Sequence, residues 1–197
     1  MPKVGMEPVR RQQLIEATIN VVANVGLQAT TINLISREAG LSSGIISHYF
    51  GGKQGLIEAT VRYLLDQLKV NLLAALANQK LTPLQRLMAI VETNFSPVQR
   101  APAATKTWLS FWAQSLHDPQ LARLQDINKK RLVSNLRYAY RQVLAREQAS
   151  EAAEMTAALI DGFWLRCSLS EADDKRFDQA VAHCKRFIET QLPATHH

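Results

Sequence analysis

The chain has 197 residues, which is enough for one or two domains with a substantial core. Its 47% hydrophobic and 20% charged residues are typical of a globular protein, and no apolar run approaches the roughly 20 residues that span a bilayer. The N-terminus, MPKVGMEPVRR, lacks the apolar segment of a signal peptide, so we expect a cytoplasmic protein with no membrane partner. Only 8 Gly and 7 Pro favour an all-α fold.

The net charge of +6 permits an anionic partner such as nucleic acid. The charge is not concentrated, however, because residues 1–53 hold five Lys and Arg against three Glu, and the rest hold 18 against 14. The two cysteines, Cys167 and Cys184, match no disulfide framework and no metal-ligand spacing. We expect them to be buried free thiols.

Sequence motifs of enzymes are missing. No GxGxxG follows a strand, Gly51-Gly52-Lys53 lacks the spacing of a phosphate loop, and the five histidines show no HExxH pattern. Ser47 and His48 make a poor nucleophile and base because adjacent helical positions point about 100° apart. We therefore expect a protein that is not an enzyme, with no catalytic residues, no metal site and no cofactor.

The first predicted helix begins near Glu7-Pro8 and stops at Gly26. Its apolar face contains residues at helical spacing: Leu14, Thr18, Val21, Val22 and Val25. Arg10 and Arg11 lie near its start. They have two equally good interpretations, contact with nucleic-acid phosphates or a solvated surface.

Residues 31–50, TINLISREAGLSSGIISHYF, predict two short helices that meet at a sharp corner. Ile32, Ile35 and Ala39 give the first an apolar face, Thr31 caps it, and Gly40 ends it. Leu41 fills the corner. Ser42 caps the second helix, Ser43 to Phe50, which turns Ile46 and Tyr49 or Phe50 inward.

The outward face of the second helix is small and polar, consisting of Ser43, Gly44, Ser47 and His48. Such a face suits a helix that enters the major groove of DNA, so the corner is interpreted as a helix-turn-helix. An ordinary corner between two helices is the alternative. Lys53 favours the DNA interpretation, because a cation at a helix N-terminus makes sense when a phosphate shares the site.

A long helix over residues 53–78 is predicted by a leucine-rich stripe that begins at Leu56 and ends at Leu76. It joins a DNA-binding domain, residues 1–53, to a helical effector and dimerisation domain, residues 54–197. Thr82-Pro83, Pro102, Pro119, Ser150 and Asp174 mark the starts of later helices, with a loop over residues 96–102 and one helix running from Pro119 to about Leu144. About nine helices result.

The second domain concentrates aromatic residues: Trp108, Phe111 and Trp112 on one helix, and Phe163-Trp164 on a later one. Such a stripe is more often core than a ligand site. Tryptophan faces nevertheless attract a quaternary ammonium group, with help from a carboxylate such as Asp161 or Glu92. The last two helices cannot bury both of their faces alone, so a homodimer through them is expected.

The segment AGLSSGIISHYFGGKQGL resembles the DNA-binding signature of TetR-type repressors. The resemblance implies that the DNA-binding residues are Thr31, Ser42, Ser43, Gly44, Ser47, His48, Tyr49 and Lys53. The order Ser47-His48-Tyr49 departs from many relatives, which carry an aromatic residue followed by Tyr and His.

Further segments, including WLSFWAQSLHDPQLARLQ and AALIDGFWLR, resemble the TetR-type repressors of the choline-to-glycine-betaine genes. This implies a dimer on double-stranded, palindromic operator DNA that is released by a small-molecule effector, choline or a related quaternary ammonium compound. We expect Trp108, Phe111, Trp112 and Trp164 to hold it. A TetR-type repressor for a different small hydrophobic or cationic effector is the alternative.

Overall fold

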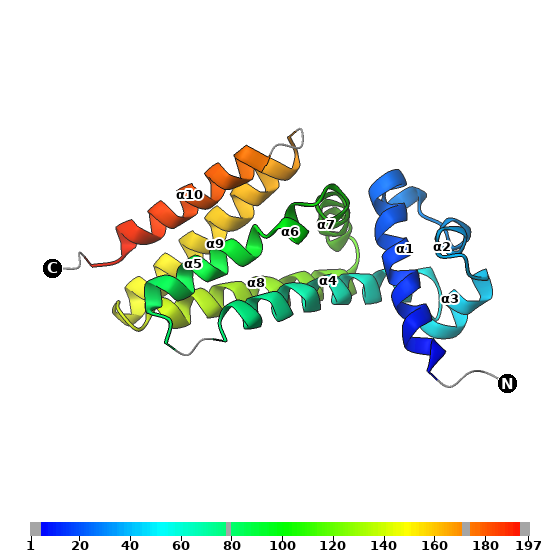
Figure 1. Cartoon of the computed structure of the whole chain (residues 1–197), viewed down its shortest axis with the longest axis horizontal. Coiled ribbons are helices and arrows are strands. Elements are labelled where there is room, and N and C mark those ends of the chain that lie inside the picture. The colour runs from blue at the N-terminus through cyan, green and yellow to red at the C-terminus, as the bar shows by residue number, and fades with distance from the viewer. Residues whose placement is uncertain (1–4, 78–79, 171–173, 194–197) are drawn as a thin grey trace. The chain divides into compact units, whose positions relative to one another are not determined.

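The computed structural model describes residues 5–77, 80–170 and 174–193. Over these ranges the regular structure is entirely helical, which confirms the predicted all-α fold (Figure 1). None of the described helices is long and apolar enough to cross a membrane. The helices are α1 (Met6–Ala29), α2 (Ile32–Ala39), α3 (Ser43–Phe50), α4 (Lys53–Ala75), α5 (Pro83–Asn94), α6 (Pro97–Arg100), α7 (Pro102–Ser115), α8 (Pro119–Tyr140), α9 (Arg146–Ser168) and α10 (Asp174–Gln191).

The chain forms two compact units. The first contains Met1–Asp66 and Ala101–Gln125, and the second contains Gln67–Arg100 and Asp126–His197. The units divide the chain within α4, between α6 and α7, and within α8, whereas the predicted domains divide it at residue 53. The predicted division stays a prediction.

The first unit is built around the packing of α1, α2, α3 and the start of α4. Its buried core consists of Leu14, Ala17, Val21, Ile35, Ile46 and Leu56. Helix α7 packs along α1, where the Thr107 hydroxyl donates to the Ile19 carbonyl at 3.4 Å. The α2–α3 corner is therefore held on a core that its own apolar residues help to form.

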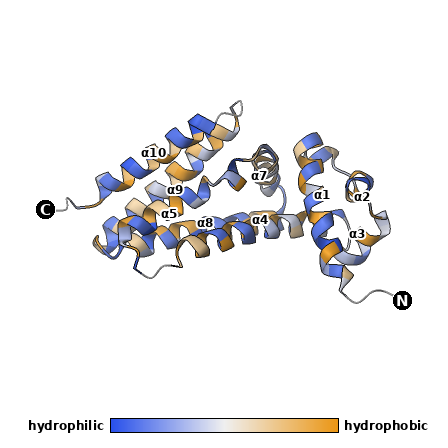
Figure 2. Ribbon diagram, viewed as in Figure 1, coloured by the Kyte–Doolittle hydropathy of each residue, from blue (hydrophilic) through white to orange (hydrophobic). Residues whose placement is uncertain are grey.

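The second unit packs α10 against both α9 and α5. Hydrophilic and hydrophobic residues are mixed along α9 and α10, as expected of amphipathic helices (Figure 2). Helix α5 starts with a complete capping box between Thr82 and Gln85. Deep in the unit, Tyr140 is fully buried and its hydroxyl lies 2.8 Å from that of Thr156. Burial raises the pKa of Tyr140 to about 12, against the opposing effect of the Thr156 hydrogen bond.

Several predicted helix boundaries are corrected. Residues 96–102 are not all loop, because Pro97–Arg100 forms the single turn α6, with proline at a first-turn position. Helix α8 ends at Tyr140 instead of about Leu144. The Arg141 N–H still bonds to the Arg137 carbonyl, but those of Gln142 and Val143 bond to carbonyls only three residues earlier.

The start of α9 was predicted wrongly at Ser150. The helix begins at Arg146, because the intervening residues are acceptable helix formers and Glu147 favours a helix N-terminus. The Ser150 hydroxyl instead donates to the Arg146 carbonyl at 3.0 Å. Helix α4 ends at Ala75, and residue 78, the predicted end, lies outside the described residues.

Gly26 interrupts α1 as predicted, with non-helical φ and ψ of 79° and 161°, although a last turn continues to Ala29.

Candidate functional site

The corner between α2 and α3 is formed by local hydrogen bonds that the sequence predicts. The Leu34 N–H donates to the Thr31 hydroxyl at 3.2 Å, which caps α2. Gly40 takes a left-handed conformation with φ of 63° and ends α2. Ser42 occupies the N-cap position of α3, but its hydroxyl makes no capping hydrogen bond there. The helix-turn-helix geometry is therefore present, although α3 begins without a side-chain cap.

Helix α3 presents a polar outer face. Its only fully buried residue is Ile46, which is 0% exposed, while Ser42, Ser43, Gly44, Ser47 and His48 are exposed. Tyr49 and Phe50 are half-buried against the core of the first unit. The His48 ring lies beside the Tyr49 ring, with centroids 5.2 Å apart. Hydroxyls, exposed backbone and an imidazole are groups that can reach base edges and phosphates.

The turn between α3 and α4 brings Lys53 to the first position of α4. Gly51 and Gly52 both have positive φ, 72° and 129°, which side chains rarely tolerate. Lys53 is half-buried. A third glycine, Gly55, lies against the end of α3, because a Cβ there would stand 1.9 Å from the Phe50 carbonyl oxygen.

Sequence reasoning missed Gly55. The available signal was a glycine inside an apolar helical pattern, which lowers helix stability by about 1 kcal/mol and so usually has a packing reason.

The N-terminal end of α1 contacts the C-terminal end of α3 through Arg11. Its guanidinium carbon lies 5.2 Å from the Tyr49 ring centroid and 5.0 Å from that of Phe50. Arg11 Nε also donates to Glu7 Oε1 at 2.8 Å. Arg11 thus contacts a carboxylate of its own helix and two aromatic rings of α3.

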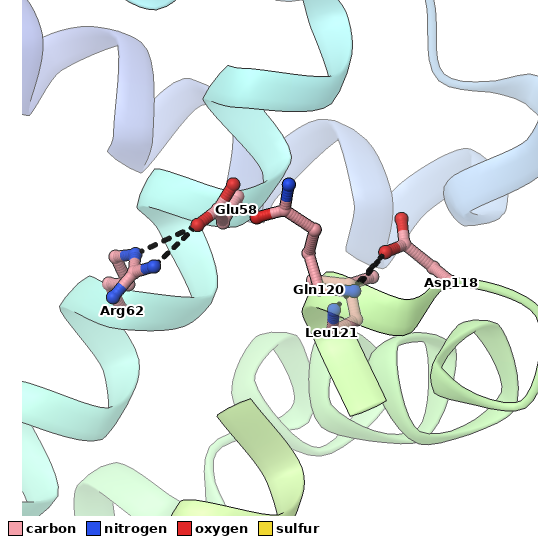
Figure 3. A network of polar contacts seen from close by, with 5 residues as sticks. All are labelled: Glu58, Arg62, Asp118, Gln120 and Leu121. Atoms are coloured by element: carbon pink, nitrogen blue, oxygen red, sulfur yellow. Dashed lines mark hydrogen bonds and ion pairs between the residues drawn. The ribbon is translucent and has the colours of Figure 1, made fainter. Parts of the chain in front are cut away.

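A polar network ties the first turn of α4 to the start of α8. Asp118 Oδ1 accepts from the N–H groups of Gln120 and Leu121 at 2.8 Å and 3.2 Å, as a helix N-cap does (Figure 3). Its other oxygen accepts from Gln54 Nε2. On the neighbouring turns of α4, Arg62 pairs with Glu58 at 2.5 Å (Figure 3).

The four aromatic residues of the predicted effector site belong to different units. Trp108 and Phe111 are buried and Trp112 is half-buried on α7 in the first unit. Trp164 is buried on α9 in the second unit, where its Nε1–H donates to the Gln99 carbonyl at 3.3 Å. A shared pocket made by all four stays a prediction.

The two candidate carboxylates for an effector site have different surroundings. Glu92 forms an ion pair with Lys185. Asp161 retains solvent contact, yet crowding by protein atoms raises the pKa of its carboxyl from 3.8 to about 6, with Lys129 acting in the opposite direction. Of the two carboxylates, Asp161 is therefore the more available to an effector.

Cys167 and Cys184 form no disulfide; Cys184 is buried as predicted, whereas Cys167 is only half-buried. Burial raises the pKa of Cys184 to about 12. Within residues 5–77, 80–170 and 174–193, no three His, Cys, Asp or Glu side chains cluster in a way that could hold a metal ion.

A helix-turn-helix with an exposed polar second helix and a following lysine defines this chain as a DNA-binding protein with an additional helical unit. Residues 14–60 match the family described as bacterial regulatory proteins, tetR family. Residues 83–193 match the C-terminal domain of BetI-type transcriptional repressors. The chain belongs to the TetR family of transcriptional regulators, with a C-terminal domain of the BetI type.

Its relatives agree. The chain is 50% identical to the HTH-type transcriptional regulator BetI of Klebsiella pneumoniae (strain 342), over 98% of this chain and 99% of the relative. It is 51% identical to BetI of Yersinia pestis (strain Pestoides F), over 98% and 97%. The relatives are transcriptional regulators, and this chain is one as well, not an enzyme.

Solved structures share the fold. A transcriptional regulator from Pseudomonas aeruginosa PAO1 is similar with a TM-score of 0.81 and 28% identity, over 93% of this chain and 90% of that one. A regulator from Saccharomonospora viridis, solved in complex with choline, has a TM-score of 0.77 and 23% identity, over 94% and 98%.

Proposed function

We propose that this regulator, acting in the cytoplasm, represses the choline-to-glycine-betaine genes and releases its operator when choline or a close derivative binds. The observation that carries the proposal is the 50% identity to a BetI regulator over nearly the full length of both chains. A match of this extent includes the exposed face of α3 as well as the helices of the second unit. The same DNA target and the same effector class are therefore the simplest expectation.

Choline suits the aromatic side chains of this chain chemically. Its quaternary ammonium group has no N–H to donate, so a tryptophan face is a better partner than a hydrogen-bond acceptor, at up to about 2 kcal/mol per desolvated contact. Trp108, Phe111, Trp112 and Trp164 are the residues proposed to hold it. The choline complex of the Saccharomonospora viridis regulator supports this effector class for the fold.

Dimerisation through α9 and α10 is part of the proposal. Helix α9 leaves Met155 46% exposed and Ala158 exposed, and Leu169, which directly follows the helix, is 70% exposed. On α10, His183 stacks on Phe163 of α9 with ring centroids 5.5 Å apart. A symmetric dimer would cover this face and would match a palindromic operator with half-sites roughly 34–36 Å apart.

Release of DNA requires that effector and operator favour different conformations of the dimer. Helix α4 is the proposed link, because it runs without interruption from Lys53, beside α3, into the second unit. A coupling free energy of about 1–3 kcal/mol would weaken operator binding roughly 5- to 150-fold.

The test is fluorescence anisotropy on labelled DNA from upstream of the choline-oxidation genes, at fixed salt, with and without choline. Binding that choline weakens supports the proposal in full. Binding indifferent to choline supports the alternative, a repressor for another small hydrophobic or cationic effector, and related amines would be tried next. Failure to bind this DNA specifically would overturn the proposed target genes.

The aromatic residues can be tested in the same assay. Trp112→Phe and Trp164→Phe keep an aromatic side chain but reduce the attraction for a cation, so we expect weaker choline binding with unchanged DNA affinity. Unchanged choline affinity in both variants would contradict the proposed site.

A further inference from the structure

Arg11 lies where α1 meets the last turn of α3. Two aromatic rings, Tyr49 and Phe50, lie 5.2 Å and 5.0 Å from its guanidinium carbon. These are the last two residues of α3. Phe50 is followed by Gly51 and Gly52, which both have positive φ, and then by Lys53.

The guanidinium group is well suited to this position. It is planar and permanently charged, it stacks on aromatic faces, and it can hydrogen-bond in its own plane at the same time. Glu7, one turn earlier on α1, accepts such a bond from Nε at 2.8 Å. The Glu7 carboxylate therefore orients the guanidinium, and the guanidinium restrains the two rings.

A direct phosphate contact by Arg11 is the competing role. The Arg11 side chain is 40% exposed, so it is open to solvent. However, Glu7 offsets its charge and the guanidinium already lies over two aromatic rings, which leaves it a weaker partner for a phosphate than an unpaired arginine would be.

We propose that Arg11 is a positioning residue for DNA recognition. It fixes the C-terminal turn of α3, and so the place of Lys53, without contributing a phosphate contact of its own. The proposal rests on DNA binding by the family and is independent of the genes controlled or the effector sensed.

The probe is a duplex that the full-length wild-type protein selects from a random pool, so that no operator sequence is assumed. Affinity is measured by anisotropy at several salt concentrations for the wild type, Arg11→Ala and Arg10→Ala. Arg10→Ala is the matched control, since it removes the same charge one residue earlier. Thermal unfolding of each variant verifies that the fold is kept.

We expect Arg11→Ala to bind the duplex about five- to tenfold more weakly, as loss of two cation–π contacts implies. The slope of log affinity against log salt should not change. A slope reduced in magnitude by about 0.9, the signature of one lost phosphate contact, would overturn the proposal. Unchanged affinity would overturn it as well.

A double-mutant cycle gives a second, independent readout. Phe50→Leu removes one ring that Arg11 restrains while keeping an apolar side chain in the core. If Arg11 acts through the rings, Arg11→Ala should weaken binding by a clearly smaller factor in the Phe50→Leu background than in the wild type. Equal factors in both backgrounds would contradict the positioning role. If Arg11→Ala unfolds, Arg11→Lys takes its place in the same cycle.

Discussion

At the scale of single residues, the close approach of α4 to the end of α3 depends on a hydrogen atom in place of a methyl group. The Cβ of an alanine at position 55 would stand 1.9 Å from the backbone oxygen of Phe50, which no side-chain rearrangement can relieve. We expect Gly55→Ala to shift the α3–α4 turn, to lower the free energy of unfolding by about 2 kcal/mol or more, and to abolish operator binding. Urea unfolding and anisotropy measure the two effects.

Gly44→Ala is the matched control for stability. A Cβ at Gly44 meets nothing within 4 Å, so alanine should leave the unfolding free energy equal or raise it by up to about 1 kcal/mol. Similar losses of stability for both variants would show that the contact with Phe50 is not the cause.

Most roles with local causes could be predicted from the sequence, although the expected Ser42 cap is not made. The Thr31 cap, the left-handed Gly40 and the outward Ser43, Ser47 and His48 depend on neighbours within a few positions, and the structure has them as predicted. The partners of Arg11 and Gly55 are set by how helices meet in space. No spacing rule connects residue 11 with residues 49 and 50, so their contact could not be predicted.

At the scale of secondary-structure elements, Asp118 starts α8 and also holds the first turn of α4. Asp118→Ala removes a side chain that accepts from two backbone N–H groups, so we expect the unfolding free energy to fall by about 1 kcal/mol. Asp118→Ser should recover most of this loss, because serine is a good N-cap although it is too short to keep the bond to Gln54. Urea unfolding distinguishes the variants, and Gln54→Ala isolates the contribution of the bond to α4.

Equal losses for Asp118→Ala and Asp118→Ser would contradict the capping role and would assign the effect to the bond with Gln54.

The existence of the longer helices was predictable because their apolar stripes persist over many turns. Their ends were harder, as the wrong start at Ser150 shows. A serine is a good cap, but Arg146, Glu147 and Gln148 continue a helix equally well, and the packing of Ala149 in the core selects the earlier start.

At the scale of the whole molecule, the proposed palindromic operator needs two copies of α3 at a fixed separation, which the proposed dimer would supply. Met155 lies near the middle of α9 and is 46% exposed, whereas its neighbours Ala153 and Thr156 are buried inside the second unit. A dimer through α9 and α10 would bury this side chain. Met155→Glu would then place a charge in an apolar interface, where an unpaired carboxylate is costly.

We therefore expect Met155→Glu to raise the dimer dissociation constant at least tenfold, equivalent to about 1.4 kcal/mol, and to weaken operator binding at protein concentrations below that constant. Sedimentation velocity gives the first quantity and anisotropy the second. Val143→Glu is the matched control, because Val143 is 39% exposed but follows α8 outside the two helices. A Met155→Glu protein that stays dimeric would place the interface elsewhere. A monomer that still binds a single half-site weakly would show that α3 recognises DNA on its own and that the dimer sets only the spacing.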